Sequence, residues 1–348
     1  MASRGTAQPT DMPRRGGVFT SLPATCALGV ALMCVFAGVS LLYGTKPIPA
    51  ASIWRALVAF DPDRAADLII REIRLPRVVM GAMVGAAFAL AGAVMQALTR
   101  NPLASPSLTG INAGGSLFLV IALINMPDLD VLRAAAVSFV GACVGVALVY
   151  GIASASPRGM TPVRLAIAGL MVSAVLQAFS GMLANYFMLR FELLYWTMGG
   201  FSNVRWSQIL TVLPVFVVCT VGILAMAPQL SIMMLGRDTA SSLGVRVSFV
   251  RTLGMALVLL LTGSAIAVAG PIGFVGLIVP HMSRALVGFD YRRVLPVSAA
   301  IGCGLVVLPD ILCRRFGDGF MPVGVYTALI GAVCFVIINR RVVHRSAV

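Results

Sequence analysis

Long apolar stretches separated by short polar segments make up almost the whole chain. Each stretch is continuously apolar and does not alternate between apolar and polar residues, which is typical of membrane-spanning helices and not of a membrane β-barrel. Lipid offers the backbone no hydrogen-bond partners, so each stretch must satisfy its own N–H and C=O groups as a helix. We predict ten such helices, at approximately residues 18–43, 74–99, 109–125, 132–153, 164–187, 207–227, 250–270, 275–286, 294–313 and 322–339.

Two of the ten predicted helices are unusually short. The stretch 109–125 is one, and the stretch 275–286 covers only about half a bilayer at ~1.5 Å per residue. A half-span flanked by glycine and proline is stable only where it packs against protein or lines a cavity. The pattern therefore favours the interior of a transporter over a simple membrane anchor.

Composition excludes a soluble fold. Of the 348 residues, 59% are hydrophobic and only 11% are charged, whereas about a quarter of the residues of a soluble domain are charged. The fold class we predict is all-α, a polytopic membrane protein of about ten transmembrane helices. The seven cysteines are scattered singly, without a CxxC spacing, and are expected to be buried apolar side chains.

The net charge of +14 comes almost entirely from arginine, because Lys46 is the only lysine. The arginines lie in short loops without interleaved aromatic residues, which favours contact with membrane lipid over nucleic acid. An even number of helices places both termini on one side, and the arginine bias of the loops favours the cytoplasm. We expect a multi-pass protein of the bacterial inner membrane, with cytoplasmic tails at 1–17 and 342–348 around a transmembrane domain at 18–341.

Four motifs distinguish this chain from a generic helical bundle. They read RLPRVVMGAMVGAAFALAGAVMQALTRNPLASPSLTGINAGGSL (Arg74–Leu117), LGRDTASSLGV (Leu235–Val245), GPIGFVGLIVPHMSRALVGFDYRRVLP (Gly270–Pro296) and MPVGVYTALIGA (Met321–Ala332). In this order and spacing they resemble the permease family of binding-protein-dependent ABC importers for ferric siderophores, haem and cobalamin. The resemblance covers about residues 20–341.

The resemblance implies a homodimer served by two cytoplasmic ATPase subunits and a periplasmic substrate-binding protein. The pore would lie on the two-fold axis, lined by parts of the helices near Gly81–Gln96 and Ala166–Leu183. The first of these regions is dense in glycine and alanine. Small residues let helices approach closely in lipid, so the residues themselves predict dense packing there.

The segment Leu235–Val245 is predicted to form a short surface helix. Asp238 or Thr239 is placed to cap it, Ala240 and Leu243 share one face, and Gly244 is placed to end it. Lipid headgroups are one partner for its apolar side; the resemblance implies instead that it couples the permease to the ATPase. The predicted coupling residues are Leu235, Gly236, Arg237, Asp238, Thr239, Ala240, Ser241, Ser242, Leu243, Gly244 and Val245.

The chain carries no G-x-x-x-x-G-K-[ST] phosphate loop, and its one lysine lies in a predicted outer loop. ATP and Mg²⁺ are therefore expected on the separate ATPase subunit. We predict that this chain is a transport subunit and not an enzyme, with no catalytic residue, no cofactor and no metal site of its own.

Three arginines, Arg74, Arg77 and Arg314, are predicted at the outer face. The resemblance implies that they pair with glutamates of the binding protein, because a planar guanidinium can hold a carboxylate through two parallel hydrogen bonds. Snorkelling to lipid headgroups is the alternative. Arg315 is adjacent and is placed to substitute for Arg314.

Two further groups are predicted gate or translocation-path residues by resemblance. The first, RNPLASP, holds Arg100, Asn101, Pro102, Ser105 and Pro106, and its prolines also fit a purely structural turn between helices. The second, Arg190, Tyr195 and Trp196, lies in an aromatic-rich outer segment that also fits an interfacial aromatic belt. The spacing from Arg190 to Trp196 is one residue longer than in haem permeases, which argues against haem as cargo.

Other positions carry weaker expectations. His281 is expected to be structural, because no second histidine or cysteine lies at ligand spacing. Asp290 and Arg292 are expected to form a local ion pair or a secondary ATPase contact. The resembled family carries an acidic residue at the position of Phe320 and a proline at that of Val333.

The function predicted is ATP-driven import of an iron chelate, preferably a ferric siderophore, by alternating access. Haem or cobalamin is the alternative cargo within the same family. A secondary transporter driven by an ion gradient is the alternative of another class, but such proteins usually carry acidic residues near mid-membrane. Asp310, near the end of a predicted helix, is the nearest candidate.

Overall fold

The computed structural model describes residues 22–43, 48–106, 110–126, 128–155, 162–197, 199–201, 204–316 and 322–346, and every regular element in them is a helix. The predicted tail 1–17 lies outside these residues. The helices are α1 (Leu22–Leu42), α2 (Ala50–Val58), α3 (Ala65–Leu68), the π-helix η1 (Ile69–Arg74), α4 (Leu75–Thr99), α5 (Ile111–Asn125), α6 (Val131–Ser154), α7 (Pro162–Tyr186), α8 (Arg190–Thr197), α9 (Trp206–Ala225), α10 (Ala227–Met233), α11 (Arg237–Ser242), α12 (Val247–Ala269), α13 (Val275–Val287), α14 (Tyr291–Phe316) and α15 (Val323–Ser346).

Each predicted apolar stretch coincides with one of these helices, so the all-helical fold is confirmed. Within the described residues, six helical stretches are long and apolar enough to cross a membrane: Ala65–Thr99, Leu132–Ser154, Arg164–Tyr186, Trp206–Ala225, Val247–Ala269 and Tyr291–Arg315. Four shorter apolar helices accompany them: Ala27–Leu42, Ile111–Asn125, Val275–Val287 and Val323–Cys334. That all ten helices enter the membrane stays a prediction.

The second helical stretch begins earlier than the sequence pattern predicts. α3, η1 and α4 run continuously from Ala65 to Thr99, 35 residues in all. Hydropathy detects only the apolar part of this stretch, because its first turns carry exposed charged residues such as Arg71 and Glu72. The π-helical turn lies at this junction, a geometry often found at functional sites.

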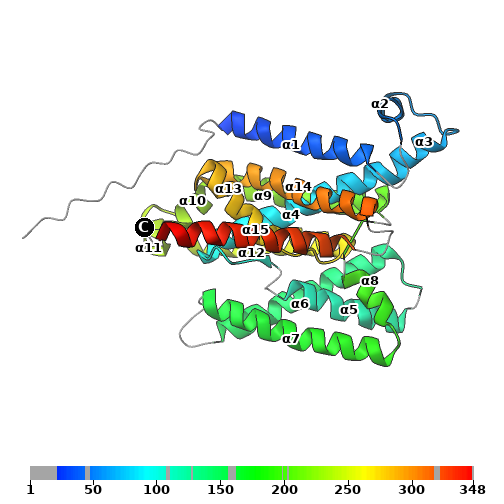
Figure 1. The fold of residues 1–348 in the computed structure, drawn as a ribbon. Coiled ribbons are helices and arrows are strands. Elements are labelled where there is room, and N and C mark those ends of the chain that lie inside the picture. Colours follow the sequence, from blue (N-terminus) through cyan, green and yellow to red (C-terminus); the bar gives the residue numbers. More distant parts are fainter. Residues whose placement is uncertain are drawn as a thin grey trace, which may run out of the picture.

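The main helices run roughly parallel or antiparallel to one another, which gives the bundle two ends (Figure 1). α2 and α3 lie at one end, which we call the arginine end because Arg74, Arg77 and Arg314 lie there. α10 and α11 lie at the opposite end, called the coupling end, together with the end of α15 (Figure 1).

α4 forms the centre of the bundle and packs against α14, α12, α13 and α9. Every residue from Met83 to Thr99 is buried within the single chain. The prediction that Gly81–Gln96 lines the pore is therefore wrong. The same small side chains that suggested close packing allow the neighbouring helices to enclose α4 completely.

Two glycine contacts show how close these helices are. A Cβ placed on Gly85 of α4 would lie 2.2 Å from the carbonyl oxygen of Gly302 in α14. A Cβ placed on Gly92 would lie 2.0 Å from the carbonyl oxygen of Gly276 in α13. Only glycine fits at such positions, so the prediction of dense packing around this stretch is confirmed.

The predicted half-span is α13, a helix of 13 residues. It packs against α14, α4 and α15, and most of its side chains are buried. A short helix is tolerated at this depth because protein surrounds it.

Candidate functional site

The arginine end holds a buried ionic cluster formed by Arg77, Asp310 and Arg314. The Arg77 Nε donates to both carboxylate oxygens of Asp310, at 2.8 and 3.1 Å, and its Nη2 donates to Oδ1 at 2.6 Å. The Arg314 Nε lies 3.1 Å from the Asp310 Oδ2. Only 13% of the Arg77 side chain, 4% of Asp310 and 8% of Arg314 is exposed. One carboxylate thus holds two guanidinium groups from different helices.

The same cluster reaches α1. Arg314 donates from Nη2 to the Ser40 hydroxyl at 2.5 Å, and Arg74 donates from Nη1 to the Leu41 carbonyl at 2.6 Å. The three predicted docking arginines are therefore brought together, but within the chain's own packing and not as free surface groups. Their docking role stays a prediction; the adjacent Arg315 is exposed.

Sequence reasoning noted Asp310 only as the nearest acidic residue to a span. The pairing of Arg77 with Asp310 joins positions 233 residues apart and leaves no local trace. The spacing of Asp310 and Arg314, four residues apart on one helix, is the signal that could have identified half of the cluster.

The coupling end contains the predicted short helix, α11. Gly236, at φ 122°, precedes the helix, while Asp238 and Thr239 lie inside it. The prediction that Asp238 or Thr239 caps the helix is therefore wrong, since the glycine makes the sharp entry turn. Gly244, at φ 80°, terminates the helix region as predicted.

The two leucines of this segment are exposed. Ala240 is buried against the bundle, whereas 65% of Leu235 and 59% of Leu243 is exposed. Ala240 and Leu243 therefore do not share a buried face, because Leu243 lies in the turn after the helix. The exposed pair provides an apolar contact surface at the coupling end.

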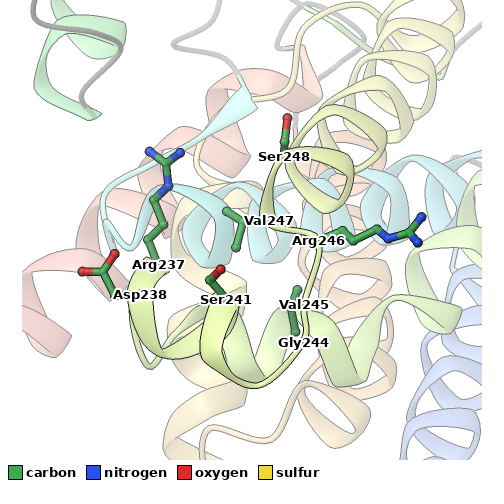
Figure 2. A pocket seen from close by; sticks show the side chains of 8 residues that line it. All are labelled: Arg237, Asp238, Ser241, Gly244, Val245, Arg246, Val247 and Ser248. Carbon is green, nitrogen blue, oxygen red and sulfur yellow. The ribbon is translucent and has the colours of Figure 1, made fainter.

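An open cavity of about 510 Å³ lies beside this segment (Figure 2). α11 and the following turn frame it, with the side chains of Arg237 and Arg246 on opposite sides (Figure 2). Its lining residues are Arg237, Asp238, Ser241, Gly244, Val245, Arg246, Val247 and Ser248. Such a lining suits a protein partner and lipid headgroups alike, so the coupling role of the segment stays a prediction.

The RNPLASP segment forms the turn that its prolines predict. α4 ends at Thr99, and the next residue, Arg100, takes the left-handed conformation at φ 50°. The Asn101 side chain then accepts a hydrogen bond from the Leu103 N–H at 2.9 Å. Pro102 lies in the turn, and Ser105 is buried. A Cβ placed on Gly276 would lie 3.1 Å from Cδ of Pro106, so the turn packs on the start of α13.

This turn also reaches the coupling segment. A Cβ placed on Gly236 would lie 3.6 Å from Nη1 of Arg100. The predicted inner gate and the predicted coupling segment are thus neighbours in space, although about 130 positions separate them in the sequence.

The second predicted gate group lies at the opposite end. Arg190, Tyr195 and Trp196 belong to α8, at the arginine end (Figure 1). Arg190 is exposed, while Trp196 is partly buried against the main core. The two predicted gate groups are therefore separate, and the gate role of each stays a prediction.

Asp290 has a different contact from the expected one. Its Oδ1 accepts a hydrogen bond from the Arg292 backbone N–H at 3.0 Å and one from the Ser231 hydroxyl at 3.4 Å. Asp290 therefore caps the start of α14 and attaches it to α10; no ion pair with Arg292 is present in the described part of the chain. His281 lies in α13, and α15 continues through Val333, while Phe320 falls outside the described residues.

The described residues contain no group of three or more His, Cys, Asp or Glu side chains that could hold a metal ion. Their polar groups instead form structural contacts at both ends of the bundle.

With this geometry in view, comparison with known proteins identifies the family. Residues 31–341 match the FecCD transport family. The chain belongs to the FecCD transport family. It is 38% identical to the iron(3+)-hydroxamate import system permease protein FhuB of Bacillus subtilis (strain 168), over 90% of this chain and 82% of that protein. It is 37% identical to the Fe(3+) dicitrate transport system permease protein FecC of Escherichia coli (strain K12), over 90% of this chain and 96% of that protein.

A solved structure agrees. The inward-facing conformation of a putative metal-chelate type ABC transporter superposes with a TM-score of 0.81 at 27% identity, covering 92% of this chain and 99% of that one. Members of the FecCD family are permease subunits of ABC importers, so this chain is a transport component and not an enzyme. The predicted family and class of function are confirmed.

Proposed function

We propose that this chain is the permease that carries a ferric chelate, of the siderophore class, across the bacterial inner membrane by alternating access. It works as a homodimer with two ATPase subunits and receives its cargo from a periplasmic binding protein. The coupling end faces the cytoplasm and the arginine end faces the periplasm. The observation that carries this proposal is similarity, over 90% of this chain, to permeases named for iron(3+)-hydroxamate and Fe(3+) dicitrate import.

The distribution of charge supports a translocation path without an ion relay, so that the energy for transport comes from the separate ATPase subunits. Of the described acidic residues only Asp67 and Asp310 are buried, and both lie at the arginine end, where each pairs with arginine. A relay for protons or sodium needs an acidic group near mid-membrane. The described spans place none there, which disfavours the gradient-driven alternative.

Cobalamin is the second candidate cargo. The cobalamin import system permease protein BtuC of Halobacterium salinarum is 38% identical over 87% of this chain. Iron chelates are preferred because the FhuB and FecC proteins, each matched over 90% of this chain, are named for iron(3+)-hydroxamate and Fe(3+) dicitrate.

The surface of α7 supports the homodimer and its pore. This helix is only partly covered by the rest of the chain. It exposes Ile167, Leu170, Met171, Val175, Phe179 and Met182. We propose that this face meets the second copy and lines the path, and that the exposed side of α9 contacts lipid.

Uptake by reconstituted protein tests the proposed function. Proteoliposomes containing the permease and its ATPase, with binding protein and radiolabelled ferric hydroxamate outside, are expected to accumulate chelate only when ATP is inside. Cyanocobalamin in the same vesicles tests the second cargo. Accumulation driven by a pH or sodium gradient, without the ATPase, would contradict the proposal.

The ATPase contact is predicted to depend on the exposed leucines of the coupling segment. Leu243→Glu removes an apolar side chain from the contact surface and adds a charge, so the affinity for the ATPase is expected to fall about tenfold or more. Co-purification and microscale thermophoresis with the ATPase measure this. Leu57→Glu, at an exposed position of α2 at the opposite end of the bundle, is the matched control and should leave ATPase affinity unchanged. Equal effects of the two substitutions would contradict the assignment.

The binding protein is predicted to dock at the arginine end. Asp310 already pairs with Arg77 and Arg314. A glutamate of the binding protein must therefore compete for the same N–H groups or bind the exposed Arg315. Arg315→Glu is expected to slow association about tenfold at low salt. Arg133→Glu, at an exposed position of the same end, is the control. Unchanged association kinetics for Arg315→Glu by surface plasmon resonance would remove this surface from the docking contact.

A further inference from the structure

A buried polar link joins the inner end of α4 to α13. Gln96 is almost fully buried, and its amide nitrogen donates to the carbonyls of Leu277 at 3.1 Å, Gly276 at 3.4 Å and Ala104 at 3.4 Å. The Gly276 carbonyl would normally accept from the residue four positions later, but that residue is Pro280, which has no N–H. Gln96 therefore supplies a donor that the helix itself lacks.

Arg284 fixes the other side of the Gln96 amide. Its Nη2 donates to the Gln96 Oε1 at 2.7 Å, so the amide oxygen faces arginine and the amide nitrogen faces the carbonyls. Only 8% of Arg284 is exposed, and no carboxylate of the described residues lies within ion-pair distance. Its Nη1 is buried without a hydrogen-bond partner in the described chain. A buried guanidinium held this way is costly, which indicates a role beyond local stability.

Arg284 continues the link to the coupling end. It lies beside the phenol of Tyr291, the first residue of α14. The Tyr291 backbone N–H donates to the Ser231 hydroxyl of α10 at 2.8 Å. The phenol oxygen of Tyr291 lies 3.9 Å from the sulfur of Met234. α10 leads directly into α11, so the contacts run from the coupling segment to Gln96.

At its far end the link reaches the predicted inner gate. The Ala104 carbonyl belongs to the RNPLASP turn, and Gly276 and Leu277 begin the half-span α13. We propose that Gln96 and Arg284 are positioning residues that transmit displacement of α10 and α11 to the RNPLASP turn and to α13. This inference rests on the proposed function as an ATP-driven importer.

The test compares uptake and ATP hydrolysis in the same proteoliposomes, with the complete transporter and its binding protein. Arg284→Met is expected to lower chelate uptake about tenfold, the size of effect that substitutions in a coupling network produce, while ATP hydrolysis stays within about twofold. The ratio of chelate transported to ATP hydrolysed therefore falls. Gln96→Leu should lower the same ratio, and the double variant should be no worse than the worse single variant, because both act through one contact.

Ser283→Ala is the matched control. Ser283 makes a buried hydroxyl contact with Ser298 between α13 and α14, outside the link, so its ratio should equal that of the wild type. If Arg284→Met does not fold, Arg284→Lys is the second variant. It keeps the positive charge but lacks the planar guanidinium, so it should still lower the ratio of chelate transported to ATP hydrolysed. Uptake and hydrolysis that fall in proportion, or additive effects in the double variant, would overturn the inference. Failure of the wild-type protein to transport would instead contradict the proposed function.

Discussion

Alanine at Gly92 is expected to prevent stable packing of α4 against α13. The added methyl group would lie 2.0 Å from the Gly276 carbonyl oxygen and 2.5 Å from its carbon, both backbone atoms that cannot rotate away. The helices must separate, and the expected loss of stability is at or above the ~3 kcal/mol upper end of the usual range for an overpacked core. Thermal unfolding of the purified protein in detergent or nanodiscs measures the loss.

Gly38→Ala is the matched control for Gly92→Ala. Gly38 also lies within a helix, but nothing lies within 4 Å of a Cβ placed there. Alanine has a higher helix propensity than glycine by ~0.8–1 kcal/mol in soluble peptides, so this variant should be neutral or more stable. The two substitutions therefore have opposite expected signs. Equal melting temperatures for both variants would show that α4 and α13 are not in backbone contact.

Removal of the Asp310 charge is expected to produce the second large effect. Asp310→Asn leaves Arg77 and Arg314 buried next to each other without a counter-ion. Breaking a buried ion pair by removing one partner typically costs about 3–5 kcal/mol, and these side chains are exposed by only 4 to 13%. The melting temperature should fall, and α1 should become more accessible to protease because Arg314 holds it through Ser40.

A triple variant separates charge imbalance from lost packing. Replacing Asp310 with leucine and both Arg77 and Arg314 with methionine removes all three charges at similar volume. Apolar replacement of a complete buried ionic cluster is often neutral, so stability should largely return. A triple variant that is less stable than Asp310→Asn would contradict the charge explanation.

The sequence by itself determined which segments are helical and what class of protein this is. Uninterrupted apolar stretches, the half-span at Val275–Val287 and the turn at Pro102 each follow from local chemistry: a backbone without water must bond internally, and proline cannot continue that bonding. The four motifs were also sufficient to indicate the family, because their residues form turns and helix contacts that belong to this fold.

Only the tertiary structure decided which side of each helix meets protein. In a membrane protein the lipid-facing and protein-facing sides are both apolar, so hydropathy could not show that α4 is enclosed while α7 is open. Nor could the sequence show that Arg77 meets Asp310 or that Arg284 meets Gln96, pairs that lie 233 and 188 positions apart. Such pairs depend on how the helices pack against one another, and no local sequence pattern shows which distant residues will meet.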